Sequence, residues 1–188
     1  MFGPIDARSW SVAAVALPSE SRVARAYATT DLADAYAIRL PKDAITDPEL
    51  LARFLFSQQA PWVAGLMRIR DTFVAGFGLK TSGQLKSPAA GSRSDKRISI
   101  FKIYEKGTHE ILLGEDDKHL NFRVSVLHQT RTVSAESAPY LVVSTVVHCH
   151  NLLGRTYILL IAPFHRLVVQ SIMRRAARAG WPVLSQTP

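Results

Sequence analysis

Apolar and polar positions alternate most regularly between residues 120 and 126. Every second position is apolar there, and this set is Leu120, Phe122, Val124 and Val126. Successive side chains of a β-strand point to opposite faces. The pattern therefore predicts a strand with one face in a core and one polar face.

Further strands are predicted on both sides of this one. Residues 98–104 and 109–113 are separated by a turn that contains Gly107, and residues 140–150 form a nearly continuous apolar run. Short connections imply antiparallel neighbours, so this half of the chain is predicted to be a meander. The polar residues 129–139 are predicted to form a loop. Residues 34–40 also alternate and predict an earlier strand, which Pro41 ends.

Two short helices are predicted before the meander. Asp47, Pro48 and Glu49 are typical of a helix start, because an Asp N-cap accepts a backbone hydrogen bond and Pro suits the first helical position. Residues 62–77 carry apolar side chains at a spacing close to the helical period. Residues 19–27 are predicted either as a short helix capped by Ser19 or as an arm lying on the domain.

A long apolar helix is predicted after Gly154. Its first half has apolar side chains on most sides, so we expect that half to be buried. Pro163 lies inside the predicted helix. An interior proline removes one backbone hydrogen bond and clashes with the preceding turn, so the helix is expected to bend or break there.

Composition indicates an ordinary globular domain. The chain has 188 residues, of which 47% are hydrophobic and 20% charged. Cys149 is the only cysteine, which excludes an internal disulfide and suits a reducing compartment, so a cytoplasmic location is expected. The uninterrupted apolar runs are shorter than the ~20 residues of a spanning helix, so no transmembrane segment is expected.

The chain is predicted to have one main folding unit. Residues 31–178 form this domain, with a flexible loop at residues 81–97, because that connection is rich in Ser, Gly, Pro and Lys. Residues 1–30 are predicted as an N-terminal arm, and residues 179–188 as a C-terminal tail.

The net charge of +8 is concentrated toward the C-terminus, where no acidic residue occurs between residues 137 and 188. Arg174, Arg175 and Arg178 lie near the end of the predicted helix. They have two interpretations: a basic face for a membrane surface or nucleic acid, or cations that complement the helix dipole. Nucleic acid is not predicted as a partner, because no nucleic-acid module or interleaved aromatic residues accompany these arginines. Peripheral membrane contact stays open.

The order of elements predicts an α+β fold in which a curved antiparallel sheet carries two short helices and a long C-terminal helix across its concave face. This arrangement resembles the helix-grip architecture of START-like (SRPBCC) and polyketide-cyclase-like domains. Five segments also resemble a bacterial family known as domain of unknown function 2867, over about residues 31–178. These segments are Asp34-Ala-Tyr-Ala, Gly78-Leu-Lys-Thr, Leu113-Gly-Glu-Asp-Asp-Lys-His-Leu-Asn-Phe-Arg-Val-Ser-Val126, His150-Asn-Leu-Leu-Gly-Arg-Thr-Tyr157 and Pro163-Phe-His-Arg166. The resemblance supports the fold and leaves the function open.

Two clusters have residue types suited to chemistry. His148 and His150 are two apart on a predicted strand, so their rings share a face, as two metal ligands would. No third ligand is evident, and neither a metal site nor a cofactor is predicted. Asp116, Asp117 and His119 are either a carboxylate-oriented general base or an exposed turn. No catalytic residue is assigned.

We expect a small-molecule-binding domain with an enclosed cavity between the sheet and the C-terminal helix, for an apolar or amphipathic ligand. One alternative is a cyclase-like or hydrolase-like enzyme that uses cavity histidines, and another is a basic interaction or membrane-surface module. The predicted ligand-binding residues are Phe122, Arg123, Val124, His148, His150, Asn151, Arg155, Tyr157, Ile161 and His165.

Overall fold

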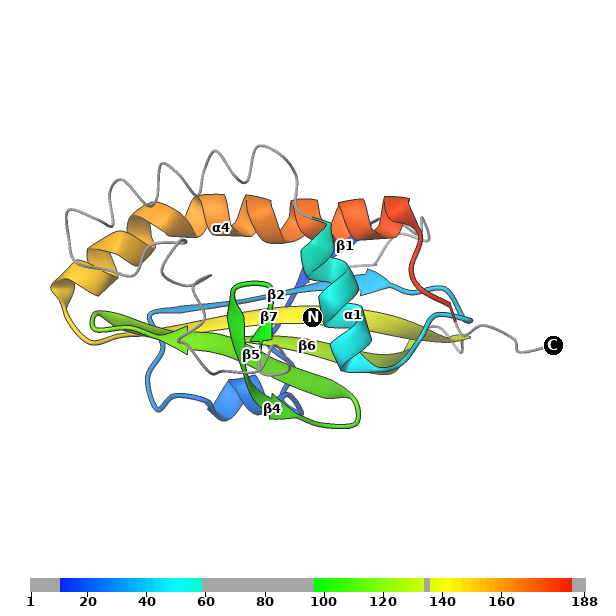
Figure 1. Ribbon diagram of the computed structural model, residues 1–188, viewed down its shortest axis with the longest axis horizontal. Helices are drawn as coiled ribbons and strands as arrows, with labels where there is room; N and C mark the ends of the chain where they lie inside the picture. Colours follow the sequence, from blue (N-terminus) through cyan, green and yellow to red (C-terminus); the bar gives the residue numbers. More distant parts are fainter. Residues whose placement is uncertain (1–10, 59–96, 134–135, 184–188) are drawn as a thin grey trace.

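The computed structural model describes residues 11–58, 97–133 and 136–183. In these residues seven antiparallel strands form one curved sheet, and two α-helices lie on one of its faces (Figure 1). This confirms the α+β class and the long C-terminal helix. The predicted helix at residues 62–77 and loop residues 81–96 lie outside the described residues. The elements are β1 Val12–Val15, the 3-10 turn η1 Arg22–Arg25, β2 Leu32–Arg39, α1 Pro48–Ser57, β3 Arg97–Ile98, β4 Phe101–Lys106, β5 Glu110–Asp116, β6 Leu120–Val133, β7 Glu136–Cys149 and α4 Leu152–Ala179.

The strands follow the order β1-β2-β7-β6-β5-β4-β3, so β3 to β7 form the predicted meander. The predicted strand at residues 98–104 is divided in two, because Ser99 adopts a φ of 55° in the turn between β3 and β4. A register shift between Ile103 and Glu105 marks an irregularity in β4. Such irregularities bend a strand and increase its twist, which suits a curved sheet.

The hairpin of β6 and β7 is the longest element of the sheet. It pairs Leu120 with Cys149 at one end and Val133 with Glu136 at the other. The prediction of a loop at residues 129–139 is therefore wrong. Threonines in this stretch are polar but β-branched, and such side chains fit a pleated strand. The hydroxyls of Thr132 and Ser137 hydrogen-bond across the hairpin at 2.8 Å.

Both faces of the central sheet are covered. On the helix face, Ile38, Val126 and Leu141 pack in one core with residues of α1 and α4. On the opposite side, the outer face, Val23 of η1 is fully buried and packs with Leu112 and Val146. A central strand buried on both sides reads as a continuous apolar run, which explains the sequence of β7.

The N-terminal segment is built into the sheet. β1 pairs with β2 from Val12 opposite Ile38 to Val15 opposite Ala35. The turn that follows is η1, and its cap is Ser21, whose Oγ accepts a hydrogen bond from the Val23 amide. Of the two predictions for residues 19–27, the helix capped by Ser19 is therefore wrong.

Helix α1 begins as predicted. The Asp47 carboxylate accepts a hydrogen bond from the Leu50 amide at 2.8 Å, and Pro48 occupies the first turn. Leu51 and Leu55 are buried in the core. Trp181, in the predicted C-terminal tail, is also buried and lies 5.7 Å from the ring of Phe54.

Helix α4 begins at Leu152, three residues earlier than predicted, because Asn151 is its N-cap and accepts from the Gly154 amide at 3.0 Å. Gly154 is required here, since a Cβ at this position would lie 2.3 Å from the carbonyl oxygen of His119. The helix is continuous through Pro163 and bends in its first half, as Figure 1 shows.

The burial of α4 is the reverse of the prediction. Its first half is largely exposed: Leu152 is 77% exposed and Leu159 is 79% exposed. Its last third anchors it, with Met173 and Ala176 fully buried against the core that contains α1. Apolar residues on every side do not specify which part of a helix packs. Small alanines near the C-terminal end allow close approach to the sheet and α1.

Candidate functional site

The sheet register divides the predicted ligand-binding residues between two faces. Val126 and Leu141 face the helices, and so does every second residue counted from them along their strands. The residues in between face outward. Phe122 and Val124 are therefore on the helix face, where Tyr157 of α4 packs in the same cluster as Phe122 and His165 approaches Asp34. Ile161 is half-buried on α4. The outer-face pair is Arg123 and His148, and the corner between β7 and α4 holds His150, Asn151 and Arg155.

A group of polar side chains lies where β2 faces the middle of α4. Asp34 of β2 has a side chain only 10% exposed, and its Oδ1 lies 3.3 Å from Nε2 of His165. Its Oδ2 accepts no hydrogen bond from the described residues. The nearest cation to Oδ2 is the guanidinium of Arg166, whose Nε is 3.9 Å away. Burying a carboxylate oxygen without a hydrogen-bond donor costs free energy, because the oxygen has lost its water and gained no donor in exchange. Most buried acceptors in folded proteins therefore have a donor.

Two neighbours extend this group. Thr145 of β7 is paired directly opposite Asp34 and is buried. Tyr36, two residues along β2, lies on the same face, and the side chain of Gln170 on α4 is close enough to lower its pKa. Burial and the negative charge of Asp34 raise the pKa of Tyr36, although the Gln170 side chain acts in the opposite direction. The phenol is therefore a neutral group at physiological pH. Asp34, Tyr36, Thr145, His165 and Gln170 are named the Asp34 site below.

The part of α4 above the Asp34 site is only partly buried. Between residues 159 and 171 the helix has no buried residue, although buried residues occur on both sides of this stretch at Ile158 and Ile172. Ile158, Ile161 and His165 recur at helical spacing and so share the side of α4 that faces the sheet. The polar groups of the Asp34 site thus lie beside a helix face that the described residues only half cover.

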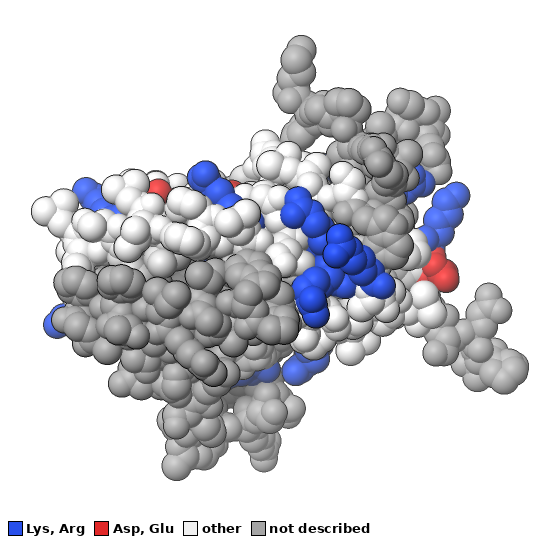
Figure 2. All heavy atoms as spheres, turned by 90° about the horizontal axis from the view of Figure 1, so that it is seen from above, with Lys and Arg blue, Asp and Glu red and all other residues white. Residues whose placement is uncertain are grey.

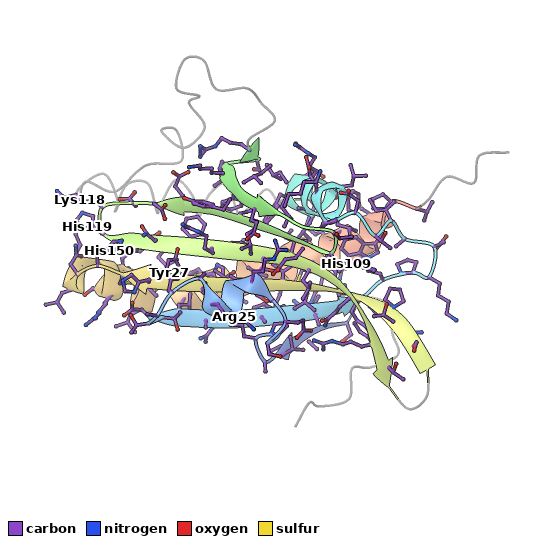
Figure 3. All side chains as sticks on the ribbon, turned by 90° about the horizontal axis from the view of Figure 1, so that it is seen from below. Arg25, Tyr27, His109, Lys118, His119 and His150 are labelled. Carbon is purple, nitrogen blue, oxygen red and sulfur yellow. The ribbon has the colours of Figure 1, made fainter. Side chains whose placement is uncertain are left out.

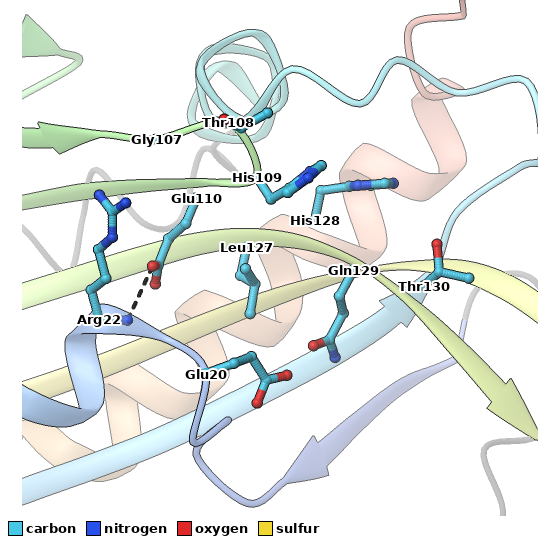
Figure 4. A pocket seen from close by; sticks show the side chains of 10 residues that line it. All are labelled: Glu20, Arg22, Gly107, Thr108, His109, Glu110, Leu127, His128, Gln129 and Thr130. Carbon is cyan, nitrogen blue, oxygen red and sulfur yellow. Dashed lines mark hydrogen bonds between the residues drawn. The ribbon is translucent and has the colours of Figure 1, made fainter.

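A different pocket, with a volume of about 500 Å3, is open beside the start of β5 and the second half of β6. Figure 4 shows that it lies between the N-terminal segment and the β4–β5 turn, and no residue of α4 lines it. Of the two acids that line it, Glu20 is exposed, and Glu110 is buried and accepts from Ser125 Oγ at 2.6 Å, from the Arg22 amide at 3.0 Å and from Ser21 Oγ. Since both carboxylate oxygens are occupied, Glu110 is a structural acceptor and not a free base.

Two histidines stand side by side at the rim of this pocket (Figure 4). The rings of His109 and His128 have centroids 6.4 Å apart. Burial lowers the pKa of His128, and the charge of His109 lowers it further. His128 is therefore neutral at pH 7.

The outer face carries a stack of aromatic and cationic side chains around Arg123. Its guanidinium lies 3.5 Å from the ring centroid of Tyr104 and 5.6 Å from that of Tyr27, and it pairs with Asp116 at 2.8 Å. Gly114 lies against β6, since a Cβ there would lie 2.2 Å from the carbonyl oxygen of Phe122 and 3.0 Å from Arg123 Cδ. Burial raises the pKa of Tyr27 to about 12. Arg123 is thus held in a packed, ion-paired position on the face opposite α4.

His148 and His150 are brought together, as their spacing predicts. Their ring centroids are 5.3 Å apart, and His148 stacks on Tyr27. Figure 3 shows Tyr27 on the side of the molecule that carries His150, with His109 farther along the sheet. Nδ1 of His148 lies 3.0 Å from the Thr29 carbonyl. In the described part of the chain no group of three metal-ligating side chains occurs.

The corner residues brace the start of α4. Nε of Arg155 lies 3.1 Å from Asp31 Oδ1, while Asp31 Oδ2 accepts from the Cys149 amide at 2.7 Å. Asn151 Nδ2 lies 3.0 Å from Nδ1 of His119. Burial raises the pKa of the Cys149 thiol to about 11, so it is not a nucleophile at neutral pH.

The Asp116, Asp117 and His119 segment is a turn that divides these side chains. Asp116 points to the outer face, where it accepts from Tyr104 Oη at 2.8 Å. Asp117 Oδ1 accepts from the Lys118 amide at 2.6 Å, as an Asx side chain does in a turn. His119 is buried beside Asn151. The geometry therefore favours the turn interpretation over a carboxylate–histidine base.

The ligand-binding residues predicted from the sequence did not include Asp34, Tyr36, Thr145 or Gln170. A signal for Asp34 was present, because it is an acid in phase with the inward-facing Tyr36 and Ile38 of an alternating strand. Its partner His165 is 131 residues away in the sequence, so the pairing required the register of the fold.

Comparison with known proteins gives one match. A family model described as "Protein of unknown function (DUF2867)" matches residues 26–172. No curated protein and no solved structure matches the chain.

Proposed function

Because the chain belongs to the DUF2867 family of proteins of unknown function, its activity has to be inferred from its own geometry, and we propose that it binds a small amphipathic molecule between the sheet and α4. In this proposal the sheet and α4 form a helix-grip of the START-like kind. The observation that carries the proposal is the buried Asp34 carboxylate, one oxygen of which has no donor among the described residues and lies beneath a half-covered stretch of α4.

The chemistry of the Asp34 site selects the ligand class. A carboxylate oxygen without a partner favours a ligand with a hydroxyl or amine donor, since a hydrogen bond to a charged acceptor is strong in a shielded site. Thr145, Tyr36 and Gln170 supply further neutral polar groups on the same side. Phe122 and Val124, on the same face of the sheet, suit an apolar body. A ligand with one polar donor end and an aliphatic or aromatic remainder fits this combination.

The position of Pro163 also supports a ligand site between the sheet and the middle of α4. It lies in the half-covered stretch, and an interior proline allows a helix to curve away from its support. The helix remains attached through Met173 and Ala176, so a change in this stretch does not release its anchored end.

The first test uses N-phenyl-1-naphthylamine, an apolar fluorophore with one N–H donor. We expect a saturable rise in its fluorescence with the full-length protein. Ile161→Trp fills the sheet-facing side of α4 and is expected to abolish the rise. Thr156→Trp adds the same ring at an exposed position of the same helix and is expected to leave it unchanged.

A second pair of variants tests the carboxylate. Asp34→Asn keeps the shape but removes the charge and should weaken probe binding about 10-fold, as expected for a hydrogen bond to a charged group. Asp43→Asn changes an exposed carboxylate and is the matched control. Circular dichroism and thermal melting establish that each variant is folded. The proposal fails if the probe shows no saturable binding, or if folded Ile161→Trp binds it like the unaltered protein.

A further inference from the structure

The side of α4 that faces away from the sheet is an exposed apolar row. Leu159 is 79% exposed, Leu167 59%, Leu160 56% and Phe164 44%. Pro163 and Phe164 follow Leu159 and Leu160 by about one helical turn, and Leu167 follows by another, so these residues share one side of the helix. A surface helix normally turns charged and polar residues to water on this side. A contiguous apolar row in that position marks a contact surface.

The same side of the helix becomes cationic in its last turns. Arg174 and Arg178 follow Leu167 by 7 and 11 residues, which keeps them close to the side of the apolar row, and both are exposed. Arg175, also exposed, donates from Nε to the carbonyl of Gln58. Viewed from the α4 side, Lys and Arg side chains gather in one patch with very little acidic surface (Figure 2). The sequence has no acidic residue from 137 to 188.

We propose that the outward side of α4 docks the protein on the surface of an anionic lipid bilayer. The apolar row would enter the boundary between headgroups and acyl chains, while the arginines pair with anionic headgroups. Helices that lie in a membrane interface combine an apolar side with cations in this way. The charge is of one sign, so its complement is a surface of the opposite sign.

A docked helix fits this fold better than a spanning one. By length and composition alone, α4 is long and apolar enough to cross a membrane. However, Met173 and Ala176 are fully buried in the core shared with α1. Crossing a bilayer would remove them from that core, whereas docking leaves them in place.

Vesicle co-sedimentation of the full-length protein tests the electrostatic half of this proposal. We expect binding to phosphatidylcholine vesicles with about 30 mol% phosphatidylserine and much weaker binding to phosphatidylcholine alone, with loss of binding at high salt. The double variant Arg174→Gln and Arg178→Gln should bind about 30-fold more weakly, since each cation near an anionic membrane strengthens binding about fivefold. The matched control, Arg25→Gln with Lys102→Gln, removes two exposed cations elsewhere and should bind normally.

A second pair of variants tests whether the apolar row contributes to vesicle binding. Leu159→Gln combined with Phe164→Gln should abolish binding to the anionic vesicles. Leu50→Gln changes an equally apolar side chain that is 53% exposed on α1 and should have no effect. An alkaline carbonate wash should release the protein from the vesicles, as it does for a surface-bound protein.

Four results would overturn the proposal: no binding to anionic vesicles at low salt, equal binding to neutral vesicles, resistance to the carbonate wash, or concentration-dependent self-association that covers the row and disappears in the Leu159 and Phe164 variant. The fluorophore assay for the Asp34 site contains no lipid, so failure of either proposal is distinguishable from failure of the other.

Discussion

Two buried carboxylates on opposite faces of the sheet differ in how completely they are satisfied. Glu110 on the outer face receives hydrogen bonds from Ser21, Ser125 and the Arg22 amide. Asp34 on the helix face has one oxygen without a donor among the described residues. A fully hydrogen-bonded buried acid stabilises the fold, whereas an incompletely bonded one is the type of group retained for a ligand.

Glu110→Ala is expected to lower the free energy of unfolding by about 3 kcal/mol, because it leaves buried hydroxyl and amide donors without an acceptor. Glu105→Ala is the control: Glu105 pairs with Arg22 but is half exposed, and such a pair contributes less than about 1 kcal/mol. Urea denaturation of both variants measures the difference. Equal destabilisation would show that the Glu110 network is not a stabilising one.

His128 makes stability depend on pH. Its pKa is lower in the folded protein than the usual value of about 6.5, so the unfolded chain binds more protons below that pH. Stability is therefore expected to be complete above about pH 6.5 and to fall on acidification toward the lower folded value. Melting temperatures at a series of pH values should show this fall, and His128→Gln should reduce it. His150→Gln, which changes an exposed imidazole, should keep the dependence of the unaltered protein.

At the scale of single elements, the ends of α4 and its middle have different roles. The last third anchors the helix in the core, and the middle is half covered on one side and exposed on the other. This division puts the candidate ligand site and the proposed membrane surface on opposite sides of the same stretch.

Met173→Ala is expected to destabilise the protein by about 2–5 kcal/mol, because it removes a fully buried side chain and leaves a cavity. Leu159→Ala removes a side chain that is 79% exposed and should change the free energy of unfolding by less than about 0.5 kcal/mol. Denaturant unfolding of the two variants tests which part of α4 is the anchor. A larger effect at Leu159 would contradict the assignment.

The sequence predicted elements better than it predicted their burial. The cap at Asp47, the alternation of residues 120–126 and the apolar run of β7 each carry a local physical signal, and each element forms. The loop predicted at residues 129–139 failed because β-branched threonines suit a strand even when they are polar. The anchored end of α4 was missed because burial depends on which partner a helix meets, and that partner, α1, is far away in the sequence.

At the scale of the whole molecule, the candidate site depends on long-range pairing. Antiparallel register alone places Asp34 opposite Thr145, and the passage of α4 over the sheet adds His165 and Gln170. Among the ten predicted ligand-binding residues, Arg123 and His148 lie on the outer face, because neighbouring positions of a strand point in opposite directions. The sequence supplied the residue types, and the register determined which of them meet.

The family match covers less of the chain than the part that is packed into the fold. The match covers residues 26–172, whereas Ser21 and Val23 precede it and Met173 and Trp181 follow it, all of them buried. We expect a fragment of residues 26–172 to lose cooperative unfolding and to expose apolar surface, because both sides of the sheet lose part of their cover. Chemical denaturation and binding of an apolar dye measure this. Fragments 26–188 and 1–172 separate the two ends, and a cooperative 26–172 fragment would contradict the expectation.

The sheet order also has a consequence for how the chain is made. Strand β2 lies between β1 and β7, and roughly 100 residues separate Arg39 from its partner Tyr140. A ribosome needs about 5–20 s to add that many residues. During that time β2 can pair only with β1, and a two-stranded sheet is marginally stable. Vectorial synthesis therefore leaves an open strand edge early and closes it only when β7 emerges, so the nascent chain, more than the finished protein, is the species that a chaperone would need to protect.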